Sequence, residues 1–141
     1  MMQPANQDTS SAAFDRYTYL KMLVAIARAD RDNGPPEYGY IRGQAIHLGV
    51  NFEQVLRDTD KNFDIGTQKA SRLTALRVLK DAIRIASMDG NFSLPEKQKI
   101  YTYAERLDIP RSDVDDLETL VGQLMALDQR WKELVAGHPD E

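Results

Sequence analysis

The chain has 141 residues, a net charge of −4, a sequence pI near 5.2 and no cysteine. This length fits one domain with its own core, and the acidic balance argues against a general binder of nucleic acids or anionic membranes, which would carry a basic excess. The absence of cysteine excludes thiolate nucleophiles, disulfides and cysteine-ligated zinc. No apolar run approaches the roughly 18 residues of a membrane span, and residues 1–11 lack a signal-peptide pattern. We therefore expect a cytoplasmic protein with no nucleic-acid partner and no membrane span.

The first part of the chain predicts two helices joined by a proline-containing turn. Residues 1–10 lack periodicity and are predicted to be a disordered tail, residues 11–136 a single domain and residues 137–141 a frayed tail. Thr9 or Ser11 is suited to cap a first helix that ends near Ala29. Its apolar stripe comprises Tyr17, Leu20, Leu23, Val24 and Ala27. A second helix is expected from Pro36 to Leu48, and Gly49 suits the left-handed residue that follows it.

The remaining elements are also helical. Asn51 and Gln54 resemble a capping box that starts a short helix to about Asp60, and residues 60–66 are a connector. A long helix is expected from Thr67 to Met88, with Leu73, Leu76, Leu79, Ile83 and Ala86 on its buried face. Ser93 and Glu96 form a second capping box, for a helix to Leu107. After Pro110, Ser112 starts the last helix, which runs to Ala136 with a break near Asp128 and is anchored by Trp131.

One pattern occurs twice at a fixed offset. Residues 20–50 align without a gap on residues 79–109, since 79 − 20 = 59 and 109 − 50 = 59. The identical pairs are Leu20 and Leu79, Lys21 and Lys80, Ile26 and Ile85, Ala27 and Ala86, Asp30 and Asp89, Pro36 and Pro95, Glu37 and Glu96, Ile41 and Ile100, Ala45 and Ala104, and Leu48 and Leu107. No strand pattern competes with the helical periods. The sequence therefore predicts an all-α fold, a compact bundle of about six to seven helices built from two pseudo-symmetric helical hairpins.

The repeated acidic residues are the candidate functional site. Packing does not require carboxylates beside a turn, yet Asp30, Glu37, Asp89 and Glu96 occur there in both copies. If the two turns meet, these residues, with Asp32 and Asn91 as further oxygen donors, have the ligand chemistry that Ca²⁺ or Mg²⁺ prefers. The same residues also suit purely structural roles, because Asp bonds readily to turn backbone and Glu is favoured in the first turn of a helix. Both interpretations stay open at the level of the sequence.

These motifs resemble the TerB-like domain family, found in tellurite-resistance proteins and in the amino-terminal region of DjlA-type co-chaperones. Four matches in the second copy carry the resemblance. They are Leu79 followed at a fixed spacing by Ile85-Ala86, then Asp89-Gly90, then Pro95-Glu96, and finally Ala104 with Leu107. Residues 24–37 carry a related pattern, but Arg31 stands where the family has Gly. The resemblance covers about residues 14–134. It implies an all-helical fold, a role in metal or chemical stress and an acidic divalent-metal site, and it implies no established reaction.

Two functions follow from these observations. The first is a non-enzymatic, TerB-like stress-response module that holds a divalent cation between two acidic turns. The second is a metal-independent scaffold for protein partners, with a homodimer as one option, in which the acidic residues only cap helices. No nucleophile, base and oxyanion arrangement is recognisable, so that we do not expect an enzyme or a catalytic residue.

Overall fold

The protein is described by a computed structural model over residues 14–29, 35–60, 62–88 and 92–137. Its elements in chain order are α2 (Arg16–Ala29), α3 (Pro35–His47), α4 (Phe52–Asp58), the 3₁₀ helix η1 (Ile65–Thr67), α5 (Arg72–Ala86), α6 (Leu94–Arg106) and α7 (Arg111–Ala136). No strand occurs in the described ranges, and the prediction of an all-α bundle is confirmed. Within these ranges, none of the helices combines the length and the apolarity required to cross a membrane.

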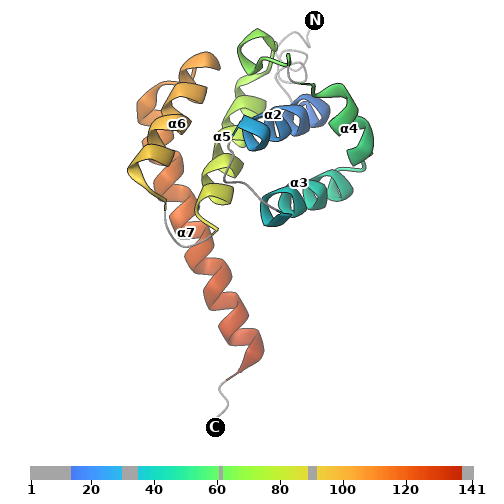
Figure 1. Ribbon diagram of the computed structural model, residues 1–141. Helices are drawn as coiled ribbons and strands as arrows, with labels where there is room; N and C mark the ends of the chain where they lie inside the picture. The colour runs from blue at the N-terminus through green and yellow to red at the C-terminus, as the bar shows by residue number, and fades with distance from the viewer. Residues whose placement is uncertain (1–13, 30–34, 61, 89–91, 138–141) are drawn as a thin grey trace, which may run out of the picture.

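The repeat is visible in the helix boundaries, and it is larger than the predicted hairpin. Helices α3 and α6 have 13 residues each and begin at equivalent positions, since 94 − 35 = 59. Helices α4 and α7 also begin at equivalent positions, since 111 − 52 = 59. The repeating unit therefore has three helices, α2–α4 in the first copy and α5–α7 in the second. Figure 1 shows α3 and α4 on one side of the central helices α2 and α5, with α6 and α7 on the other side.

The turn between the second and third helix has the same backbone in both units. Gly49 has a φ of 71°, as the sequence predicts for a left-handed residue, and the equivalent Asp108 has a φ of 60°. In each unit the residue that follows the left-handed one closes the turn: Val50 N donates to Ala45 O at 2.9 Å, and Ile109 N donates to Ala104 O at 2.8 Å. These bonds satisfy carbonyl groups at the helix end. Asp108 adopts a conformation in which glycine would have no steric cost.

An arginine stacks on an aromatic ring at equivalent positions of the two units, with the two residue types exchanged. In the first unit the Arg42 guanidinium lies 4.8 Å from the centre of the Phe52 ring, and in the second Arg111 lies 4.7 Å from Tyr101. Because 42 + 59 = 101 and 52 + 59 = 111, each arginine occupies the position of the other unit's ring. The contact between the second and third helix is therefore kept while the side chains that make it have changed places.

Each unit has its own cluster of buried apolar residues. The first cluster centres on α2 with Leu20, Leu23 and Val24, and receives Ile41 from α3 and Val55 from α4. The second centres on α5 and comprises Ala75, Leu79, Ala82, Ile83, Ile100, Ala104, Ile109, Val114 and Val121. Ile26, Tyr103 and Leu107 are packed against both clusters. The predicted apolar stripe of α2 is thus confirmed at Leu20, Leu23, Val24 and Ala27, all of which are buried.

Helices α2 and α5 begin later in the chain than predicted. Helix α2 begins at Arg16, after the non-helical residues 14 and 15, and the Asp15 carboxylate caps it by accepting a hydrogen bond from Thr18 N. The predicted caps Thr9 and Ser11 lie outside the described residues. Helix α5 begins at Arg72, not Thr67, because the Ser71 hydroxyl accepts a hydrogen bond from Thr74 N, whereas Thr67 is the last residue of η1. Leu73, expected on the buried face, is 51% exposed because it lies in the first turn of α5.

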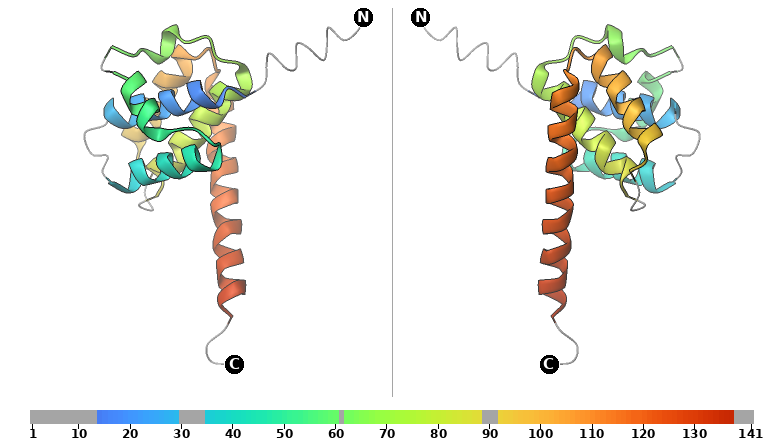
Figure 2. Two further views of the ribbon diagram at one scale, coloured as in Figure 1. Left: turned by 90° about the vertical axis from the view of Figure 1, so that its right-hand side faces the viewer. Right: turned by 90° about the vertical axis from the view of Figure 1, so that its left-hand side faces the viewer.

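The last helix differs most from its prediction. Pro110 is its N-cap residue, without a side-chain hydrogen bond, so that Ser112 lies inside the helix instead of starting it. The helix is continuous for 26 residues, and the predicted break near Asp128 is absent. Trp131 is 64% exposed and does not anchor the helix in the core. Figure 2 shows the reason: the carboxyl-terminal half of α7 extends away from the bundle.

Candidate functional site

The structure describes two of the six residues of the predicted cation site. Asp30, Asp32, Asp89 and Asn91 lie outside the described residues. Glu37 and Glu96 occupy the same position in the first turns of α3 and α6, as the repeat requires. Carboxylates are favoured there because they face the positive end of the helix dipole.

Glu96 has a structural role that the sequence predicts. Its carboxylate oxygen Oε1 accepts hydrogen bonds from Ser93 N at 2.8 Å and from Ser93 Oγ at 3.1 Å, while Ser93 Oγ accepts from Glu96 N at 3.3 Å. The capping box is therefore complete. Asn51 caps α4 in a simpler manner: it accepts from Gln54 N, whereas the Gln54 amide bonds to Asp58 instead of reaching back.

A hard divalent cation needs about six to eight oxygen ligands, of which the described residues supply few. Glu96 Oε1 is engaged in the capping box, which leaves Oε2 as the oxygen of that side chain available to a metal. Within the described residues, no group of three or more His, Asp or Glu side chains is placed to hold a metal ion. The cation site therefore depends on the four predicted ligands outside the described residues, and it stays a prediction.

A buried carboxylate in α5 was not singled out by the sequence analysis. Asp81 is 4% exposed. Its Oδ1 accepts a hydrogen bond from the Tyr40 hydroxyl at 2.9 Å, and its Oδ2 accepts a short one from the Tyr19 hydroxyl. The three residues come from α3, α5 and α2, so that Asp81 joins the first unit to the central helix of the second. In the first unit the equivalent position, 59 residues earlier, is the buried apolar residue Met22.

The protein environment keeps both tyrosines protonated. Burial, followed by the negative charge of Asp81 and the hydrogen bond to it, raises the pKa of Tyr19 and of Tyr40 well above its usual value. Arg77 opposes this shift through its positive charge and stacks on the Tyr19 ring at 5.2 Å. A phenol that stays protonated is a hydrogen-bond donor, and two such donors satisfy the buried carboxylate. The arrangement is a closed polar network, and its chemistry suits structural linkage of helices.

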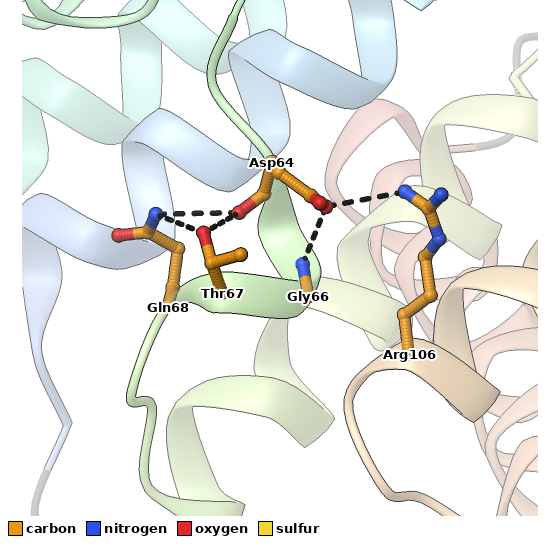
Figure 3. Close-up of polar contacts among 5 residues, drawn as sticks. All are labelled: Asp64, Gly66, Thr67, Gln68 and Arg106. Carbon is orange, nitrogen blue, oxygen red and sulfur yellow. Dashed lines mark hydrogen bonds and ion pairs between the residues drawn. The ribbon is translucent and has the colours of Figure 1, made fainter.

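The segment that connects the two units is held against the end of α6 (Figure 3). Asp64 accepts hydrogen bonds from Gly66 N at 2.9 Å and from the Arg106 guanidinium at 3.2 Å through the same oxygen, Oδ1. Its backbone carbonyl accepts from Thr67 Oγ1 at 2.8 Å and from Gln68 Nε2 at 3.2 Å. A Cβ atom at Gly66 would lie 3.3 Å from Asp64 Oδ1 and would crowd this cap. Asp64 thus fixes η1 and attaches the connector to the second unit.

A shallow groove lies between the carboxyl-terminal end of α5 and helix α7. It is lined by Ile83, Ser87, Phe92, Glu118, Val121, Gly122 and Met125. Among the described residues of this lining Glu118 is the one that is charged, and it forms an ion pair with Lys97 at 2.8 Å. Small-molecule sites generally combine an apolar lining with several convergent polar groups. The groove has the apolar part of that description, and its carboxylate is already paired.

Five of the exposed large apolar residues in the described ranges lie on the carboxyl-terminal part of α7. Leu120 is 43% exposed, Leu127 57%, Trp131 64%, Leu134 72% and Val135 66%. The first four recur at spacings of seven, four and three residues, so that they share one side of the helix. Val114 and Val121, on the side that faces the bundle, are buried. We call the set Leu120, Leu124, Leu127, Trp131, Leu134 and Val135 the α7 stripe.

The bundle supports only the first part of this helix. Ion pairs join α7 to α5 at both ends of their contact: Arg72 with Asp113 and Arg84 with Asp128, each at 2.8 Å. Every residue from 126 to 137 is exposed. The sequence predicts the apolar period of α7, but the period does not reveal that the bundle supports the helix only as far as Asp128 within the described chain.

Comparison of the chain with protein-family models, with curated proteins and with solved structures gave no match. The resemblance to the TerB-like family therefore rests on the motifs of the sequence and stays a prediction.

Proposed function

We propose that this protein is a non-enzymatic module for protein–protein interaction and that the α7 stripe is its binding surface. One observation carries the proposal: five large apolar side chains, each between 43% and 72% exposed, lie together on a helix that extends beyond the bundle. Scattered apolar residues are normal on a protein surface, but a contiguous apolar patch is typical of an interaction site.

The composition of the stripe supports a protein partner. It combines leucines with a tryptophan, the residue type most enriched among those that dominate interface affinity. The exposed residues beside it carry both signs of charge, with Asp128 and Glu133 next to Arg130 and Lys132. A helix that binds an anionic lipid surface would instead have a mainly basic polar face. An apolar centre with a mixed polar rim is the usual composition of a protein interface.

Site-specific photo-crosslinking in cells tests the proposal. A photoreactive residue at Leu127, on the stripe, is expected to form adducts with a partner, whereas the same residue at Ala126 is expected to form few. Ala126 is the matched control because it is exposed and about 100° around the same helix. The partner identified by mass spectrometry is then purified, and its Kd is measured for the wild type, Leu127→Glu and Ala126→Glu. Equal affinity for all three proteins would remove the stripe as the binding surface.

Cation binding between the acidic turns is the second candidate. It is favoured by the equal placement of Glu37 and Glu96 in helices of equal length and register. Calorimetric titration of chelator-treated protein with Ca²⁺, Mg²⁺, Mn²⁺ and Zn²⁺ tests it, with Asp89→Ala and Glu96→Ala as variants. Saturable heat that both variants lose would support the site. Absence of heat from the folded wild type would leave these residues with their capping roles.

A role in a TerB-like stress-response complex is proposed on the sequence resemblance alone. Deletion of the gene is expected to increase sensitivity to tellurite, and re-expression of the wild type to restore resistance. Failure of Leu127→Glu to restore it, beside a functional Ala126→Glu, would connect the resistance to the α7 stripe.

A further inference from the structure

We propose that the occupant of the α7 stripe is a second copy of this chain, bound so that the two α7 helices run parallel to each other. This inference rests on the proposed function, because it names the partner of the same surface. It is argued from the spacing, the charges and the area of the exposed side chains.

The spacing of the stripe is that of a two-stranded coiled coil. Leu117 packs against the second core cluster, and beyond it Leu124 and Trp131 are seven residues apart, as are Leu120, Leu127 and Leu134 in turn. These are the a and d positions of a heptad, which place apolar residues on a seam that can pack against an identical helix. The buried Val114 and Val121 occupy e positions, about 40° around α7 from the a residues and about 100° from the d residues, so that the bundle lies against one flank of the seam. A second helix therefore packs along the part of the seam within residues 126–137, all of which are exposed.

The charges beside the seam favour the parallel orientation. Asp128 and Val135 are e positions of this heptad, and Gln123 and Arg130 are g positions. In a parallel pair, each g residue faces the e residue five positions later in the second helix, so that Arg130 lies against Val135 and Gln123 against Asp128. In an antiparallel pair, g faces g and e faces e. The register that sets Leu124 against Leu134 and Leu127 against Trp131 of the second copy also places Arg130 near Arg130 and Asp128 near Asp128. Like charges in direct opposition are unfavourable. The exposed charges thus oppose this antiparallel register and leave the parallel pair without a conflict.

The exposed area fits a reversible dimer. With full burial of an aliphatic side chain worth about 60–120 Å² and of an aromatic one about 150–250 Å², the five exposed side chains of the stripe amount to about 240–450 Å² per chain. Two stripes then bury about 500–900 Å² of apolar surface, and a polar rim brings the total near the lower limit of about 1,000–1,200 Å² for specific interfaces. A dimer of this size is expected to be weak and to respond to concentration.

The oligomeric state of the full chain tests the proposal. Sedimentation equilibrium between about 1 μM and 1 mM is expected to show a monomer–dimer equilibrium, with Leu127→Glu raising the Kd at least about tenfold and Ala126→Glu having little effect. The chain has one tryptophan, Trp131, and its exposed indole is a built-in probe. Its fluorescence is expected to shift to shorter wavelength as the wild type dimerises. Circular dichroism of each variant checks that it is folded.

Single cysteines determine the orientation, because the natural chain has none. In a parallel pair, Leu124→Cys and Leu134→Cys should each form a disulfide-linked dimer on mild oxidation, whereas the exposed Ala126→Cys should not. The two sites are ten residues, or about 15 Å, apart along the helix. An antiparallel pair in one register can link at one of them but not at both, since disulfides need Cα atoms within about 7 Å. A link at one site alone would overturn the parallel arrangement.

The outcomes separate the two proposals. A wild type that stays monomeric to about 1 mM, or a dimer that Leu127→Glu does not weaken, would overturn the second copy as the occupant. A monomeric wild type whose purified partner still binds through Leu127 would retain the interaction surface and refute only the homodimer. A monomeric wild type whose purified partner binds Leu127→Glu as tightly as the wild type would refute the binding surface itself.

Discussion

The polar network around Asp81 makes a quantitative prediction. Tyr19→Phe removes one hydroxyl and leaves the ring, so that it creates no cavity and tests only the hydrogen bond to the buried carboxylate. A hydrogen bond to a charged group contributes about 1.5–3 kcal/mol, and Tyr19 is fully buried, so that water cannot replace it. We therefore expect Tyr19→Phe to lower the free energy of unfolding by about 2 kcal/mol.

Urea denaturation followed by circular dichroism measures this change, and the Tm should fall by roughly 6 °C for a chain of this size. Tyr40→Phe should cost less, because its hydroxyl is only partly buried. A double-mutant cycle with Asp81→Asn isolates the pairwise interaction of Tyr19 with the carboxylate. A loss below about 0.5 kcal/mol for Tyr19→Phe, with an unchanged m-value, would refute the closed network.

Three further predictions concern stability. Folding raises the pKa of both Tyr19 and Tyr40 from 10.0. Their contribution to the free energy of unfolding is therefore complete below pH 10 and is lost as the pH rises above it. Tyr19→Phe should flatten this alkaline loss of stability in denaturation measured from pH 8 to 12. Asp108→Gly should leave stability unchanged or raise it by up to about 1 kcal/mol, whereas Gly49→Ala should lower it by about 1 kcal/mol, because both backbones are left-handed. The opposite order in thermal melts would contradict the equivalence of the two turns. Asp64→Ala should cost about 1 kcal/mol through loss of the η1 cap, with Asp60→Ala, in the same connector, as a comparison that does not remove it.

Local signals of the sequence predicted the fold where side chains act on their own backbone. Ser93 with Glu96 and Gly49 are placed as predicted, because a capping box and a left-handed turn need only neighbouring residues. The predicted start of α5 was wrong because Thr67 and Ser71 are both suitable caps, and Thr67 instead ends the 3₁₀ helix η1. The repeat predicted two related hairpins, but the third helix of each unit has few identical residues and emerged only from the matching boundaries.

The site was less accessible to sequence reasoning. Asp81 had one signal, a carboxylate within the buried arc formed by Val78, Leu79 and Ala82 of α5. Its partners Tyr19 and Tyr40 are 62 and 41 residues away, so that no local pattern connects them. The apolar period of α7 was recognised, but periodicity states which side of a helix is apolar and not what covers it. The period therefore predicts Trp131 as an anchor of the last helix, whereas its side chain is exposed.

The anchorage of α7 also determines how its free half remains helical. Starting a helix in water is unfavourable because several residues must be ordered for the first hydrogen bond, whereas each later residue adds a bond of its own. In α7 the turns packed against α5 and α6 provide that nucleus, and residues 129–136 only propagate it. A partner therefore meets a preformed helix and does not have to order a coil, so that association should proceed without the slow, entropically opposed step of coupled folding.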